Sequence, residues 1–72
     1  MTYLIDANHP GIIFACGTPA LAEEFFAAMQ EEGSAMHYIS EKENFPSWDV
    51  CHVQEDFDPE RFNPFYYWWY TV

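Results

Sequence analysis

The sequence predicts a two-layer α+β domain, in which one helix packs on an antiparallel sheet in the order ββαβββ. Two observations support this fold class. Short apolar stretches bounded by turn residues recur along the chain, which is typical of strands. One stretch, 19–32, instead repeats apolar residues at helical spacing. The 72 residues suffice for a single domain, 1–72, without a second core.

The predicted strands follow from apolar runs separated by turn residues. The first strand is expected over 2–6, and turn residues over 7–11 then lead into a second strand over 12–16. We expect these two strands to pair antiparallel. The second is apolar on both faces, which predicts a central position in the sheet. Further strands are predicted over 35–40, 48–53 and 65–70.

Helix boundaries are marked by residues with specific backbone preferences. Thr18 is the predicted N-cap, and Pro19 stands at the first helical position, where its missing N–H costs nothing. The helix is expected to end near Glu32, because Gly33 can adopt the left-handed conformation. Its apolar stripe repeats every four residues and contains Leu21, Phe25 and Met29. One helix covers only part of a sheet, so much of the opposite face is expected to stay open.

The last predicted strand consists entirely of aromatic residues. Successive side chains point to opposite faces of a strand, so one set can line the core while the other needs separate cover. The pattern leaves open which set is exposed. Tyr and Trp are frequent interface anchors, which makes Tyr66, Trp68 and Tyr70 candidate partner-binding residues.

Charge is strongly one-sided. Twelve Asp and Glu stand against only Lys42 and Arg61, for a formal net charge of −10. Such a surface repels nucleic acids and anionic membranes and attracts basic protein surfaces, so the expected partner is a basic nucleic-acid-binding protein or complex. The candidate acidic residues are Glu31, Glu32, Glu41, Glu43, Glu55, Asp56, Asp58 and Glu60. The alternative is that the acidic charge only keeps the protein soluble.

Two of these carboxylates occupy an unfavourable place. Glu31 and Glu32 fall in the last helical turn, where the helix dipole disfavours negative charge by about 0.3–1 kcal/mol per residue. This placement favours a role in binding a partner. The alternative is a solvated helix end at which salt screens the charge.

No pattern in the sequence predicts catalysis, a cofactor or a metal. The cysteines and histidines have none of the usual zinc-ligand spacings, and Cys51 and His52 are strand neighbours that face opposite sides. The segment 17–19 lacks the flanking glycines and the lysine of a phosphate loop. A Cys–His pair that meets only in the fold stays open. The N-terminus has no basic region of a signal peptide, and no apolar run is long enough to span a membrane, so we expect a cytoplasmic protein with reduced cysteines.

A short, strongly acidic, cysteine-poor chain with this α+β pattern resembles, as a class, the small phage-encoded inhibitors of bacterial defence, such as anti-CRISPR and anti-restriction proteins. The resemblance covers size and composition over the whole chain and includes no diagnostic motif, so it assigns no functional residue. It implies an inhibitor in the bacterial cytoplasm that covers the nucleic-acid-binding or recruitment surface of a complex such as a CRISPR–Cas effector, by nucleic-acid mimicry. A second hypothesis is a structural or assembly module that self-associates, or binds a protein, through the aromatic C-terminal strand. A homodimer is compatible with both.

Overall fold

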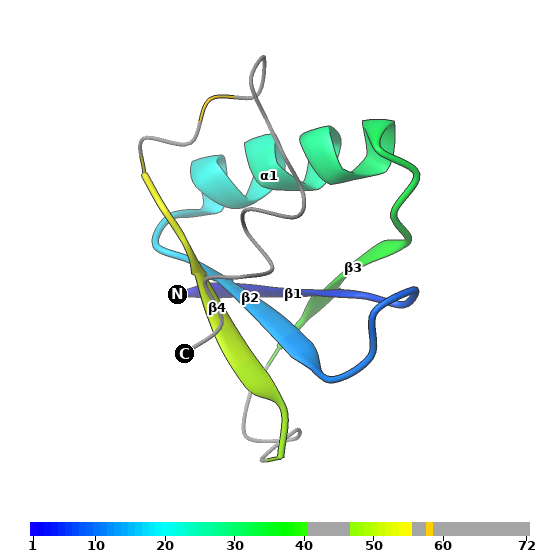
Figure 1. The fold of residues 1–72 in the computed structure, drawn as a ribbon. Helices are drawn as coiled ribbons and strands as arrows, with labels where there is room; N and C mark the ends of the chain where they lie inside the picture. The colour runs from blue at the N-terminus through cyan, green and yellow to red at the C-terminus, as the bar shows by residue number, and fades with distance from the viewer. Residues whose placement is uncertain (41–46, 56–57, 59–72) are drawn as a thin grey trace.

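The structure, a computed structural model, describes residues 1–40, 47–55 and 58. In chain order these contain β1 (Thr2–Asp6), β2 (Ile12–Cys16), α1 (Pro19–Glu31), β3 (Met36–Ile39) and β4 (Asp49–Val53) (Figure 1). The prediction of a small α+β protein with one helix is confirmed at this level. The observed order is ββαββ, because the predicted strand 65–70 lies outside the described residues.

The strands form one mixed sheet in the order β3-β1-β2-β4. β1 pairs antiparallel with both neighbours, so Leu4 stands opposite Phe14 and Tyr38. β4 runs parallel to β2, with Cys51 opposite Phe14. The predicted fully antiparallel sheet is therefore wrong. The chain passes from β3 at one edge to β4 at the other, and apolar patterning does not encode the direction in which the last strand then runs beside β2.

The predicted pairing of the first two strands and the central place of β2 are confirmed. Their connection begins with a turn, in which the His9 N–H donates to the Asp6 carbonyl at 2.9 Å. Gly11 then has a φ of 102°, which glycine adopts without steric cost. Its carbonyl accepts a hydrogen bond of 2.9 Å from the Asp49 N–H, so the same connection also fixes the start of β4.

The helix begins and ends as its local sequence predicts, within one residue. The Thr18 Oγ1 accepts a hydrogen bond from the Leu21 N–H at 3.1 Å, as expected of an N-cap. At the other end Gly33 has a φ of 88°. The N–H of Gly33 donates to the Gln30 carbonyl and that of Ser34 to the Met29 carbonyl, both at 3.0 Å. This is the Schellman arrangement, which satisfies two carbonyls at the end of α1.

Buried side chains from the helix and the strands form a shared hydrophobic core. The ring centroids of Phe25 in α1 and Phe14 in β2 are 4.9 Å apart, and the angle between the two ring planes is 51°. The predicted stripe residues Leu21, Phe25 and Met29 are buried, and the buried helical residues also include Ala22 and Ala28.

The sheet face that points away from α1 is also buried at its centre, along β2. Ile13 and Ala15 alternate with Phe14 along this strand and are only 0% and 2% exposed. The expectation that much of this face stays open is therefore wrong at its centre. The unbroken apolar run of β2 already pointed this way, because strands buried on both faces lack polar alternation.

Substitution of Phe25 tests how much core packing contributes to the stability of the fold. Replacing it with alanine removes a fully buried ring, and we expect a loss of about 3–5 kcal/mol in the free energy of unfolding. Urea denaturation followed by circular dichroism measures this loss. Phe25→Leu, with a smaller loss, serves if the alanine variant does not fold. Glu24→Ala, at an exposed position of the same helix, should change the free energy by less than about 0.5 kcal/mol. Equal effects of Phe25→Ala and Glu24→Ala would contradict the packing.

Candidate functional site

The described surface carries carboxylates without Lys or Arg, since Lys42 and Arg61 both lie outside the described residues. Every described Asp and Glu except Asp6 is exposed, namely Glu23, Glu24, Glu31, Glu32, Asp49, Glu55 and Asp58. Because the whole chain has only two basic residues against twelve acidic ones, the protein carries a strongly negative field.

Helix α1 presents most of this charge as two pairs. Glu23 and Glu24 lie near its start, and Glu31 and Glu32 at its end. At a rise of about 1.5 Å per residue, the pairs stand roughly 12 Å apart along the axis. No basic residue occupies the last turn, so nothing there offsets the unfavourable helix-dipole interaction of Glu31 and Glu32.

A fifth carboxylate, that of Glu55, approaches the helix from the segment that follows β4. Glu24 and Glu55 line an open hollow of about 290 Å³ together with Thr18, Ala20 and Leu21. The Glu55 Oε1 lies only 3.6 Å from the place where a Cβ on Gly17 would stand. The structure thus brings Glu55 beside the start of α1, next to a glutamate that the sequence did not single out for binding.

The predicted site residues do not all gather in one place. Glu31 and Glu32 lie at one end of α1, whereas Glu55 lies beside the other. Asp58 is described and exposed. The remaining predicted residues lie outside the described part of the chain: Glu41, Glu43, Asp56, Glu60, Tyr66, Trp68 and Tyr70.

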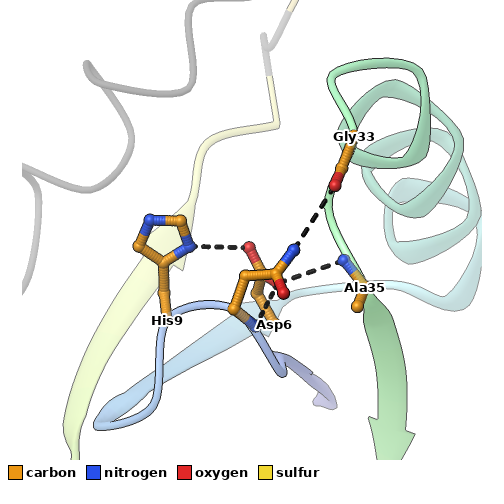
Figure 2. A network of polar contacts seen from close by, with 5 residues as sticks. Asp6, His9, Gly33 and Ala35 are labelled. Atoms are coloured by element: carbon orange, nitrogen blue, oxygen red, sulfur yellow. Dashed lines mark hydrogen bonds and ion pairs between the residues drawn. The ribbon is translucent and has the colours of Figure 1, made fainter.

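Asp6 is the one buried charged residue of the described chain, and no local pattern in the sequence indicates its role. One carboxylate oxygen, Oδ1, accepts hydrogen bonds from the N–H groups of Asn8 at 2.9 Å and Ala35 at 3.1 Å. The other, Oδ2, lies 3.0 Å from Nδ1 of His9. Figure 2 shows these side chains meeting where β1 ends and the chain enters β3.

Two further hydrogen bonds extend this cluster. The Asn8 side-chain amide donates to the Gly33 carbonyl at 3.4 Å (Figure 2), and the Ala7 N–H donates to the Ala35 carbonyl at 2.9 Å. The cluster therefore joins the end of β1, the connection to β2, the end of α1 and the start of β3.

The hydrogen bonds determine the acidity of Asp6. Burial alone would raise its pKa, because a buried carboxylate loses hydration. The hydrogen bonds from Asn8, His9 and Ala35 outweigh this effect, so the pKa of Asp6 lies below its ordinary value. Asp6 is therefore a carboxylate at neutral pH.

The two cysteines are buried thiols on adjacent strands, Cys16 in β2 and Cys51 in β4. Burial raises the pKa of Cys16 to about 12, with a further contribution from Cys51, and burial raises the pKa of Cys51 to about 11. Both are therefore protonated at neutral pH, whereas a nucleophilic cysteine requires a thiolate. His52 is exposed while its neighbour Cys51 is buried, as expected of residues on opposite faces of a strand.

Two other kinds of feature are absent from the described ranges. Over 1–40, 47–55 and 58, no group of three or more Cys, His, Asp or Glu is arranged to hold a metal ion. In the same part of the chain, no helix has the length and apolar character needed to cross a membrane.

Comparison of the chain with protein-family models, with curated proteins and with solved structures finds no match in any of the three.

Replacing Asp6 with asparagine should destabilise the protein in a pH-dependent way. The lowered pKa means that the carboxylate contributes its stabilisation above its ordinary pKa and loses it as the pH falls. We expect Asp6→Asn to lose about 2–3 kcal/mol of unfolding free energy at neutral pH, and this gap to shrink below about pH 4. Urea denaturation at a series of pH values measures the loss at neutral pH and its decrease at low pH. Asp49→Asn, at an exposed position, is the control. A gap that does not change with pH would contradict the assignment.

Both thiols should react slowly while the protein is folded. Because their pKa values are raised to about 12 and about 11, we expect reaction with an aromatic disulfide reagent at pH 8 to be about a hundredfold slower, or more, than in urea. Ser47→Cys, which adds a thiol at an exposed position, should give one fast-reacting equivalent. Fast reaction of both native thiols in the folded protein would contradict their burial.

Proposed function

We propose that this protein is a small acidic inhibitor that binds the basic nucleic-acid-binding or recruitment surface of another protein. The observation that supports this function best is the set of exposed carboxylates on α1 and after β4, in a chain that has twelve Asp and Glu but only two Lys and Arg. A basic groove built for phosphates would attract such a surface, and nucleic acid would then compete with it for the same site.

Electrostatics alone would give fast but salt-sensitive association. Charges separated by more than about 8 Å are largely screened at physiological ionic strength, so attraction between the two proteins falls as salt rises. Carboxylates on a helix are held at fixed spacing, which allows several of them to meet basic side chains at once. Glu31 and Glu32 support this function further, because a helix end without a binding role gains stability from basic residues at these positions.

The target class follows from the resemblance to phage-encoded inhibitors of bacterial defence. On that resemblance, the target is a bacterial defence complex such as a CRISPR–Cas effector, whose nucleic-acid channels are lined with Lys and Arg. The protein would act by occupying such a surface, without itself cutting or modifying anything.

Neutralising the helix carboxylates tests this function. In the variant Glu23→Gln/Glu24→Gln/Glu31→Gln/Glu32→Gln, helix propensity and side-chain size are nearly unchanged. We expect the concentration that displaces target DNA from a purified CRISPR–Cas effector to rise about tenfold or more, because steering and rim contacts weaken. Raising salt well above about 0.15 M should have the same effect on the unmodified protein. DNA-binding anisotropy measures both.

The control carries neutral changes on the same exposed face. Ala27→Gln/Gln30→Ala alters the surface of α1 without altering charge, and it should inhibit like the unmodified protein. Circular dichroism verifies that both variants are folded. Unchanged inhibition by the quadruple variant would refute the role of the carboxylates. Absence of inhibition by the unmodified protein would refute this target class.

A further inference from the structure

The strand β3 forms one edge of the sheet, and no described strand lies on its outer side. The hydrogen bond from the Ala7 N–H to the Ala35 carbonyl identifies these residues as a hydrogen-bonded pair of the antiparallel ladder, although through this one bond only, since the Ala35 N–H donates to Asp6. Such pairs alternate along a ladder, so the backbone groups of His37 and Ile39 point toward β1. The N–H and C=O groups of Met36 and Tyr38 therefore point outward, where an added strand could bind them.

Nothing within β3 protects this edge from pairing. Edge strands are commonly blunted by Lys, Pro, inward-pointing charges or bulges, and β3 (Met-His-Tyr-Ile) contains no Lys, Pro, Asp or Glu. Its start is held by the hydrogen bonds from the Ala35 N–H to Asp6 and from the Ala7 N–H to the Ala35 carbonyl. A partner strand would therefore meet a template that is already ordered, which reduces the entropy lost on binding.

An aromatic pair stands beside the outward backbone groups. The ring of Tyr38 stacks on that of Phe26 from α1, with centroids 5.4 Å apart and an interplanar angle of 9°. Tyr38 is 51% exposed, and Phe26 is half-buried. Exposed Tyr that is already held in place is a typical interface anchor, because little side-chain entropy remains to be lost.

The charge next to this pair indicates what kind of strand would bind. Glu23 is three residues before Phe26 on α1, so both lie on neighbouring positions of the helix surface, and Glu23 is exposed. The chain as a whole has twelve Asp and Glu but only two Lys and Arg. The net charge of −10 also opposes a second copy of this chain at the edge.

We infer that the edge of β3 receives an extended, basic segment of the partner protein as an added strand, with Tyr38 and Phe26 as the aromatic contact. Backbone pairing at Met36 and Tyr38 would supply affinity, and Glu23 would favour Lys or Arg in the incoming segment. This inference rests on the proposed function, because the inference names the part of the basic partner that this protein would bind.

Amide hydrogen exchange in the protein alone tests whether the edge is available. We expect the amides of Met36 and Tyr38 to exchange much faster than those of His37 and Ile39, which are bonded to β1. Equal protection of all four amides, independent of protein concentration, would show that the edge is already occupied within the chain. Protection that appears only as concentration rises would show a second copy at the edge. Either result would overturn the inference.

A designed peptide tests the chemistry of the partner. The probe is a capped peptide in which Lys alternates with Val and Phe, compared with the same peptide carrying Glu in place of Lys. We expect the basic peptide to slow exchange at Met36 and Tyr38, and the acidic one to have no effect. N-methylation of alternate peptide amides should abolish binding in one register and spare it in the other, because only alternate amides face β3. Binding that is insensitive to both N-methylation patterns would overturn strand addition.

Two matched variants separate the aromatic contact from general attraction. Tyr38→Ala should weaken binding of the basic peptide about tenfold, as truncation of an interface anchor does. His37→Ala, at an exposed position of the same strand, should leave it unchanged. Equal losses of peptide affinity in Tyr38→Ala and His37→Ala would refute the role of Tyr38 as an anchor.

If the edge tests fail while the helix glutamine variant still loses inhibition, the proposed function stands without strand addition. If the edge binds the basic peptide but no effector is inhibited, strand addition stands and the target class falls.

Discussion

The structure depends on one buried carboxylate. Asp6, at the end of β1, bonds to the connection that directly follows it and to Ala35, the distant residue that leads into β3. A buried charge is costly unless hydrogen bonds compensate it, and here two backbone N–H groups and an imidazole provide that compensation. The start of β3, the strand that carries Tyr38 of the Phe26–Tyr38 stack, is therefore fixed by hydrogen bonds within the chain.

The other acidic residues of the described chain lie on the surface, unlike Asp6. Asp6 is inside and contributes to the fold, whereas the other carboxylates are outside and contribute nothing to the core. Two of them, Glu31 and Glu32, stand at a helix end where they act against stability. For the proposed binding to a basic protein, the hydrogen-bonded start of β3 would supply a backbone template and the surface carboxylates would supply the attraction. These are complementary requirements of binding, since charge speeds the encounter and packed contacts prolong it.

Local signals in the sequence were sufficient to predict most of the described helix and strands. Thr18 and Pro19 define one end of the helix and Gly33 the other, because each residue has a conformational or hydrogen-bonding preference that acts within a few positions. The apolar run of β2 likewise indicated a central strand. The direction of β4 could not be predicted, since side-chain patterning is similar for parallel and antiparallel neighbours. The role of Asp6 was equally hidden, because its partner Ala35 lies 29 residues away. Of the predicted binding residues, Glu55 could not be placed beside Glu24 from sequence, because their proximity depends on that same strand direction.

The central claim is that the ionised Asp6 carboxylate orders the entry to the edge strand through its hydrogen bonds to Asn8 and Ala35. The most direct measurement is an NMR titration that follows the Asp6 carboxyl carbon together with the amide protons of these two residues. The claim predicts that the pKa of Asp6 lies below the ordinary value of an aspartate, with both amide protons shifting at the same midpoint. An ordinary or raised midpoint, or amide protons that do not respond when Asp6 is protonated, would contradict it.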